Sequence, residues 1–221
     1  DNPAAWRRHL ALILPKRQKL SRGHFAAMPY AEVPAFMAAL REREAMAALA
    51  LAFLILTAAR SGEVLGARWA EIDLAAKVWT IPATRMKAGR EHWVSLSSRA
   101  LAILERLGEA KTGEFVFPGQ RHGKPLSPMS LEMMLRRMKV EGATVHGFRS
   151  AFRGWAGETT PFPREIAEAA LAHVSGDSTE RAYRRGDALE KRRELMQAWA
   201  ACLEAGENSN VIALSRKKPP A

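Results

Sequence analysis

Apolar residues recur at helical spacing along most of this chain. Between Tyr30 and Arg43 the spacing places Val33, Phe36, Met37 and Leu40 on one face of a predicted helix. The stretch from Glu44 to Ala59 is apolar on nearly all sides, which is typical of a buried central helix. It is short for a membrane span, so we expect it in the core of a globular domain.

A short polar-capped helix is predicted directly after this apolar stretch. Ser61 is of a residue type that favours the N-cap position, and Glu63 would place a negative charge in the first turn. The helix is expected to end near Arg68.

The period then changes from helical to alternating. Residues 77–84 (KVWTIPAT) and 92–97 (HWVSLS) are short and rich in β-branched and aromatic side chains. The connection RMKAGRE contains Gly89, which can turn the chain. This pattern predicts a β-hairpin.

The rest of the chain is predicted to be helical, apart from a short strand at 115–117. The expected helices cover 98–107, 130–138, 146–158, 163–172, 177–185 and 187–205. The predicted fold class is therefore mainly α with a small antiparallel β-sheet (α+β).

Composition divides the chain into three parts. Residues 1–24 are basic and interrupted by prolines, which predicts a linker from an upstream domain. Residues 25–205 carry the periodic pattern and form the predicted domain, and residues 206–221 form a tail. The chain begins with Asp-Asn-Pro, which we interpret as the start of a fragment.

The net charge of +11 indicates a polyanionic partner. Basic residues are spread along the whole chain and do not form one amphipathic helix, so nucleic acid is favoured over a membrane surface. Cys202 is the single cysteine, which excludes an internal disulfide and a cysteine-based metal site. No carboxylate cluster suited to a metal and no Gly-rich nucleotide loop stand out.

Several residues could carry phosphate chemistry. Tyr183 lies in STERAYRRGD among arginines, either as a surface residue or as a nucleophile whose anion the cations favour. Arg60 follows the apolar helix, where it could equally cap carbonyls or pair with an acid. His146 and Arg149 are three residues apart and would share one helix face. Each of these features alone is a weak signal.

Their combination resembles the tyrosine recombinase (phage integrase) family. The family's order of arginine, hairpin lysine, H-x-x-R, histidine and tyrosine matches Arg60, Lys87, His146, Arg149, His173 and Tyr183. The motifs are TAARSGEVLGARWAEID, TRMKAGREHWVSLS, TVHGFRSAFRGWA and LAHVSGDSTERAY. The resemblance runs from about Arg22 to Ala205 and is greatest to integrases of prophages and genomic islands.

The resemblance implies the integrase catalytic-domain fold for residues 25–205 and a role for each matched residue. Arg60 and Arg149 would hold the scissile phosphate, with hydrogen bonds and proton transfer from His146 and His173. Lys87 would be the general acid, and Tyr183 would form a 3′-phosphotyrosine bond. Glu63 would hold Arg60. No metal, ATP or other cofactor is implied.

The resemblance also implies partners. They are double-stranded DNA attachment sites, three further copies of the protein in a tetramer on DNA, and an accessory directionality factor. The isolated domain is expected to be monomeric, and the location cytoplasmic, with the bacterial nucleoid. The apolar segment Val211–Leu214 is expected to pack on a neighbouring protomer. Predicted contacts to the DNA backbone are Arg85, Arg90, Arg22, Lys19 and His24.

Other residues have ordinary structural interpretations. Tyr30 is expected to pack in the fold, and His92 and His122 are expected on the surface or in loops. Three alternatives to a recombinase stay open: a type IB topoisomerase, a DNA-binding regulator without catalytic activity, and an RNA-binding helical module.

Overall fold

A computed structural model describes residues 26–111, 113–173 and 187–205, with no account of the side chains of 187 and 188. The first half begins with the 3-10 helix η2 (Tyr30–Glu32) and continues through α2 (Val33–Arg41), α3 (Met46–Thr57) and α4 (Ser61–Leu65). Within these described ranges, no helix has the length and apolar character that crossing a membrane would need.

The sheet has three antiparallel strands in the order β1-β2-β3. They are β1 (Ile72–Asp73), β2 (Val78–Ile81) and β3 (His92–Ser95), with Trp79 of β2 opposite both Ile72 and Val94. The 3-10 helix η3 (Trp69–Glu71) precedes the sheet, and η4 (Ala83–Arg85) follows β2. The predicted hairpin is confirmed. The two-residue strand β1 was not predicted, because so short a segment has no periodicity.

Helices make up the second half: α5 (Ser98–Glu109), α6 (Ser130–Arg137), α7 (Gly147–Thr159), α8 (Arg164–Ala170) and α10 (Asp187–Ala205). This confirms the mainly helical class with a small antiparallel sheet. The predicted strand at 115–117 is wrong. Phe115 forms only an isolated bridge with Arg68, and the Val116 amide donates to the Ala67 carbonyl at 2.9 Å. The predicted helix at 177–185 lies outside the described residues.

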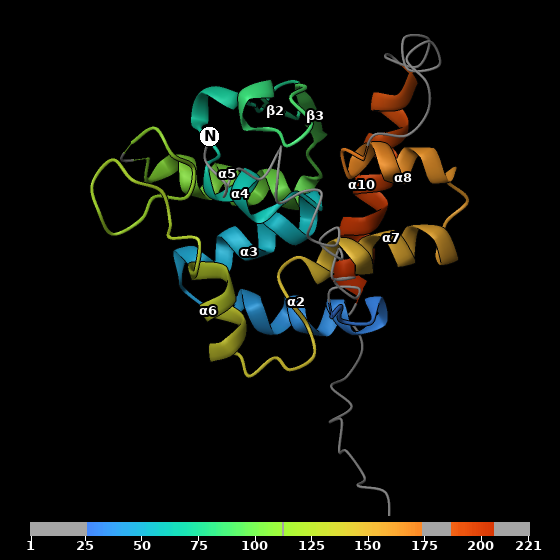
Figure 1. Cartoon of the computed structure of the whole chain (residues 1–221), viewed down its shortest axis with the longest axis horizontal. Helices are drawn as coiled ribbons and strands as arrows, with labels where there is room; N and C mark the ends of the chain where they lie inside the picture. Colours follow the sequence, from blue (N-terminus) through green and yellow to red (C-terminus); the bar gives the residue numbers. More distant parts are fainter. Residues whose placement is uncertain (1–25, 112, 174–186, 206–221) are drawn as a thin grey trace, which may run out of the picture.

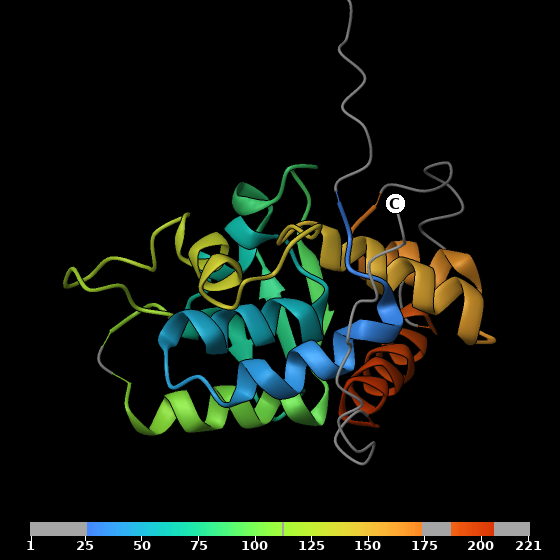
Figure 2. The same ribbon diagram turned by 90° about the horizontal axis from the view of Figure 1, so that it is seen from below.

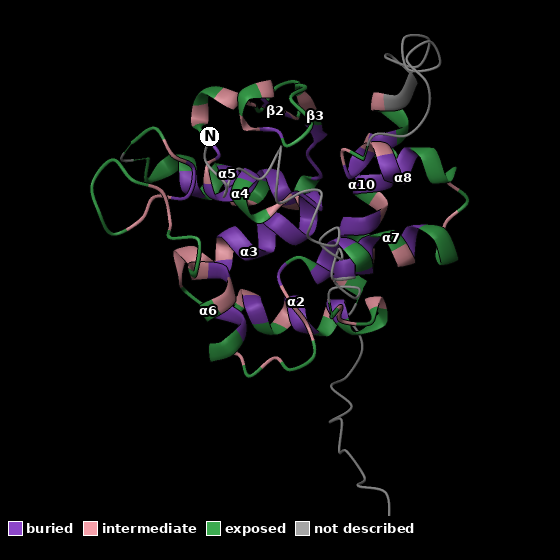
Figure 3. Cartoon of the chain, in the orientation of Figure 1, coloured by how far each residue is buried: buried purple, intermediate pink, exposed green. Residues whose placement is uncertain are grey.

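Helix α3 is the centre of the core. It packs against α2, α4, α5, α6 and α10, and the burial colouring of Figure 3 shows it almost entirely buried. Its apolar residues on all sides explain this position, because every face of the helix has a neighbour. Trp199 of α10 is fully buried and donates from Nε1 to the Ile55 carbonyl at 2.8 Å, which fixes α10 against α3.

The helices form two groups that α10 joins. Figure 1 shows α7 and α8 beside α10 on one side of the molecule, and α4, α5 and the sheet on the other. Figure 1 shows α5, α3 and α2 one below another, and Figure 2 shows the same three helices from below, with α5 along the lower edge of the view. Because α10 contacts α2, α3, α5, α7, α8 and β3, it holds both groups together.

The start of α7 is held by the chain segment that enters the domain. The Ala26 carbonyl accepts hydrogen bonds from the amide and hydroxyl of Thr144, at 3.0 and 3.2 Å. Gly147 makes this approach possible, because a Cβ there would lie 2.3 Å from the Ala26 oxygen. The glycine therefore sets the position of the turn that presents His146.

Candidate active site

Arg60 lies where α3 turns into α4. Helix α3 ends at Ala58 in the left-handed conformation (φ 49°), and Arg60 is the extended N-cap of α4. The prediction that Ser61 is the N-cap is therefore wrong, since Ser61 is the first helical residue. Glu63 replaces a side-chain cap by reaching back to the Arg60 amide at 2.8 Å.

Glu63 also holds the Arg60 side chain. Its Oε1 accepts from Arg60 Nη1 at 2.7 Å, and the carboxylate is only 5% exposed. A carboxylate bound at both oxygens fixes the arginine more firmly than a surface pair would. The Arg60 side chain keeps 26% of its surface exposed, so the fold does not enclose it completely.

Arg149 ties three segments together from inside α7. It is buried, and its Nη1 donates to the Ala58 carbonyl while its Nη2 donates to the Leu171 carbonyl at 2.7 Å. Burial, and then the nearby Arg60 cation, lower the pKa of Arg149 to about 10. The group is still charged at neutral pH, so the fold holds a positive charge where α3 and α8 end.

His173 is oriented by a carboxylate that was not predicted as a site residue. Its Nδ1 lies 2.5 Å from Glu168 Oε2, and its Nε2 lies 3.3 Å from Arg149 Nη2. Because Arg149 can only donate, this geometry assigns the proton to Nδ1 and the lone pair to Nε2. Glu168 is five residues before His173 on α8, and that spacing was the only signal of it in the sequence.

Glu168 is charged in this setting. Burial raises the pKa of Glu168, but hydrogen bonds from His173 and Arg153, with the charges of both, outweigh burial and leave the pKa below its ordinary value. Arg153 Nε lies 2.7 Å from Glu168 Oε1. Both carboxylate oxygens are therefore occupied.

His146 lies at the N-cap of α7 among four basic groups. Partial burial lowers the pKa of His146, and the charges of Arg149, Arg60, His173 and Lys87 lower it further, in that order. Arg149 donates to the Ala58 carbonyl, two residues before Arg60, and its Nη2 lies 3.3 Å from His173 Nε2, so these residues and His146 lie in one region, with Lys87 near enough to act on His146. Five of the six residues predicted for the site thus lie together, and the sixth, Tyr183, lies outside the described residues.

Lys87 is exposed on the turn between β2 and β3. The buried residue Met86 anchors the turn on one side of it. On the other side Gly89 adopts a positive φ of 62°, which favours glycine. The lysine therefore lies on a short, anchored connection that can bring its amine towards a ligand.

The predicted DNA contacts differ in their surroundings. Arg90 is exposed on the same turn as Lys87. Arg85 instead points inward and donates to Glu71 and to the Glu63 carbonyl, so the expectation that it binds the DNA backbone is revised. Three further candidates lie outside the described residues: Arg22, Lys19 and His24.

His92 is the residue that sequence reasoning misplaced. It is half-buried in β3 rather than on the surface or in a loop, and it hydrogen-bonds to the Ala170 backbone in α8. Burial, followed by the Arg192 charge, lowers the pKa of His92 to about 4. Glu63 and Arg60 also act on it electrostatically, so this neutral histidine lies near the pair that they form.

The chemistry available here is that of cations and imidazoles. In the described ranges, no group of three or more histidine, cysteine or acidic side chains is arranged to hold a metal ion. The cluster presents two guanidiniums, one amine and two imidazoles, which together suit a phosphodiester.

Comparison with known proteins finds relatives over most of the chain. The model of the phage integrase family matches residues 27–190. Prophage integrase IntA of Escherichia coli K12 is 42% identical over 161 residues, which cover 72% of this chain and 39% of IntA. The chain therefore spans less than half the length of that relative.

Solved structures show the same fold. A lambda integrase (75–356) dimer bound to a COC′ core site superposes with a TM-score of 0.56 at 21% identity, covering 76% of this chain and 63% of that one. A lambda integrase tetramer bound to a Holliday junction gives a TM-score of 0.52 at 21% identity, covering 69% and 48%.

Proposed function

The chain belongs to the phage integrase family, and from that premise we propose that it cuts and rejoins DNA at a specific site through a covalent bond to Tyr183. The observation that carries the proposal is the set of contacts that Arg149 makes with the Ala58 carbonyl, the Leu171 carbonyl and His173, which bring the segments of Arg60 and His173 to the start of α7. Lys87 lies near enough to His146 to lower its pKa, after burial and three other basic groups. Arg60, Lys87 and Arg149 carry three positive charges against the two carboxylates Glu63 and Glu168, and a DNA phosphate would offset the remaining positive charge.

The two arginines would bind the non-bridging oxygens of the scissile phosphate. Charge on these oxygens changes as the phosphorus becomes five-coordinate, and guanidiniums fixed in advance stabilise it without reorganisation. Arg60 is held by Glu63, and Arg149 is held by two carbonyls. Losing one such donor typically costs ~3 kcal/mol of barrier, or roughly a hundredfold or more in rate.

Tyr183 would supply the nucleophile. Its phenolic oxygen attacks phosphorus, the new Oη–P bond forms, and the bond from phosphorus to the 5′-oxygen breaks. Lys87 gives a proton to the departing 5′-oxygen, and His146 donates a hydrogen bond to the phosphate. His173, whose Nε2 carries the lone pair, takes up the phenol proton. The 5′-hydroxyl of another strand then reverses these steps and releases the tyrosine.

This scheme uses neither a metal ion nor ATP. The arginines and the lysine supply the positive charge that metals supply in many phosphoryl transfers. The phosphotyrosine link keeps the energy of the original phosphodiester, so rejoining needs no external source.

Residues 25–205 would form the catalytic domain, 1–24 the linker to a DNA-gripping domain, and 206–221 a tail that contacts a neighbouring protomer.

The partner would be a double-stranded attachment site. Lambda integrase, which shares the fold, is seen as a dimer on a core site and as a tetramer on a Holliday junction. We extend that assembly to this protein as four copies on two sites, with a monomer off DNA, a directionality factor, and a cytoplasmic location at the nucleoid.

Covalent trapping tests the proposal. The full-length protein would be mixed with nicked duplexes that span the junction between the mobile element and its host, beside the Tyr183→Phe variant. We expect a protease-sensitive shifted band on a denaturing gel that is lost in the variant, which still binds the duplex.

The alternatives give other outcomes. A DNA-binding regulator would yield no covalent band with either protein, and an RNA-binding module would not bind the duplex. A type IB topoisomerase would relax a supercoiled plasmid that lacks the junction sequence.

A further inference from the structure

Arg85 follows β2 on the way to the turn that carries Lys87, and its guanidinium is turned into the fold. Its Nη1 lies 2.5 Å from the Glu71 carboxylate, and its Nη2 donates to the backbone carbonyl of Glu63. The Arg85 side chain is 21% exposed and the Glu71 side chain 10% exposed. An arginine paired this way inside the fold acts on its neighbours rather than on solvent.

Gly66 provides the space for this guanidinium. A Cβ at position 66 would lie 3.0 Å from Arg85 Nη2 and 3.3 Å from its Cζ. The backbone of Gly66 has a φ of −91°, which any residue can adopt. A side chain here would therefore press on the Arg85 guanidinium, so the glycine suits the arginine rather than the conformation of the chain.

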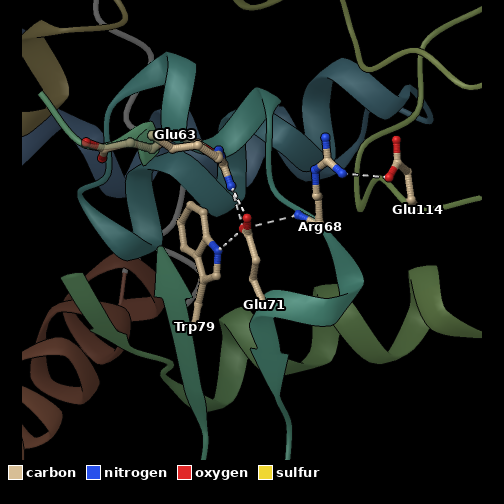
Figure 4. A network of polar contacts seen from close by, with 6 residues as sticks. Glu63, Arg68, Glu71, Trp79 and Glu114 are labelled. Atoms are coloured by element: carbon tan, nitrogen blue, oxygen red, sulfur yellow. Dashed lines mark hydrogen bonds and ion pairs between the residues drawn. The ribbon is translucent and has the colours of Figure 1, made fainter. Parts of the chain in front are cut away.

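Glu71 connects Arg85 to the sheet. Figure 4 shows its carboxylate at the centre of a polar network, where it accepts from Trp79 Nε1 at 3.0 Å and from the Arg68 amide at 3.3 Å. Trp79 is fully buried in β2. Glu71 therefore contacts both the sheet, through Trp79, and Arg85. These contacts fix the position of the segment that follows β2.

The other end of the network reaches the active site. The Glu63 carbonyl that accepts from Arg85 belongs to the residue whose carboxylate holds Arg60. Lys87 lies on the connection between β2 and β3, and Arg60 lies at the start of α4. Arg85 therefore links this connection to α4. Only the buried Met86 separates Arg85 from Lys87 along the chain.

We propose that Arg85 is a positioning residue that sets where Lys87 lies relative to the phosphate held by Arg60. This inference rests on the proposed function, in which Lys87 protonates the departing 5′-oxygen. Its distinctive consequence is that losing Arg85 impairs proton donation and leaves DNA affinity unchanged. A displacement of about 1 Å in such a group can lower a rate by roughly a hundredfold.

A substrate whose leaving group needs no proton separates this role from others. With sulfur in place of the bridging 5′-oxygen, the departing group is a thiolate. A thiol ionises near pH 8.5, whereas water ionises near pH 15.7, so the sulfur leaves without an acid. Junction duplexes with oxygen or sulfur at the cleaved position would be compared under single-turnover conditions, using the full-length protein.

We expect Arg85→Met to cleave the oxygen duplex roughly tenfold or more slowly than wild type and the sulfur duplex at the wild-type rate. Lys87→Ala should show the same pattern with a loss of roughly a hundredfold or more on oxygen. Arg68→Met is the matched control, because it removes a guanidinium paired with Glu114 on the surface and leaves the Arg68 amide bound to Glu71. It should cleave both duplexes at the wild-type rate.

Gly66→Ala perturbs the same guanidinium without removing it and should show a smaller loss of the same kind. It decides the question if Arg85→Met proves too unstable to fold. Equal slowing of either variant on both duplexes would overturn the inference, and so would weaker DNA binding that accounts for the whole loss. Failure of sulfur to rescue Lys87→Ala would instead overturn the acid role of Lys87, which belongs to the proposed function.

Discussion

Replacing Glu168 by glutamine would remove the charge that holds His173 in one orientation. In the wild type, Glu168 accepts from His173 Nδ1 at 2.5 Å and from Arg153 Nε at 2.7 Å. The glutamine amide has one oxygen for these two donors, and its NH₂ group would face one of them. We therefore expect His173 to lose its fixed tautomer and its alignment with Arg149.

The size of the effect follows from these contacts. A hydrogen bond between charged partners contributes about 1.5–3 kcal/mol, and the low exposure of Glu168 keeps solvent from replacing it. If that energy orients His173 for the transition state, its loss lowers the cleavage rate roughly 10- to 100-fold, since ~1.4 kcal/mol corresponds to a factor of ten.

Single-turnover cleavage of a nicked junction duplex would measure this rate. Nitrogen-15 NMR of the histidine rings would report the tautomer of His173 in the same variant. Glu165→Gln is the matched control, because Glu165 is exposed on the same helix. A Glu168→Gln rate equal to that of wild type, or a His173 ring that keeps its proton on Nδ1, would refute the reasoning.

Two further predictions concern stability. Gly147→Ala should lower the free energy of unfolding by about 1–3 kcal/mol, because its Cβ would lie 2.3 Å from the Ala26 oxygen. Urea unfolding would measure it against Gly157→Ala, whose Cβ meets nothing within 4 Å, and equal stabilities would contradict the packing at Ala26. His92 should make the protein less stable as pH falls from 6.5 towards 4, because the unfolded state binds a proton at the ordinary pKa of 6.5 and the folded state only near 4. The loss of unfolding free energy reaches about 3 kcal/mol. The variant His92→Gln should therefore show a flatter curve of unfolding free energy between these pH values. An unchanged slope would show that other groups cause the pH dependence.

Periodicity predicted the elements that are long and uniform. The all-apolar segment became the central helix α3, and the alternating segments became β2 and β3. Elements that depend on tertiary contacts were either missed, as β1 was, or predicted where no strand forms, as at 115–117. The two residues of β1 pair only because Trp79 and Val78 lie opposite them, and the 115–117 segment has only an isolated bridge to Arg68.

The order of the motif residues along the chain predicted most of the candidate site. It did not predict the residues that hold these side chains in place. Glu168, His92 and Arg85 have ordinary sequence surroundings, and their positions depend on how α8, β3 and α4 pack together. Arg85 shows the difficulty most clearly. A basic residue close to Lys87 suggested a DNA contact. In the structure the Arg85 guanidinium instead pairs with the carboxylate of Glu71, fourteen residues earlier in the sequence.

The central claim is that Tyr183 becomes bonded to DNA, and mass spectrometry of the trapped complex tests it most directly. After nuclease and protease digestion, the account predicts a phosphate or nucleotide remnant on the peptide that contains Tyr183. Tyr30, the only other tyrosine in the 221-residue sequence, serves as an internal control. Its hydroxyl donates to Glu158 at 2.9 Å, and that hydrogen bond raises the pKa of Tyr30 and disfavours its phenolate. A remnant on Tyr30 or on a serine, or a trapped complex without any modified tyrosine, would contradict the account.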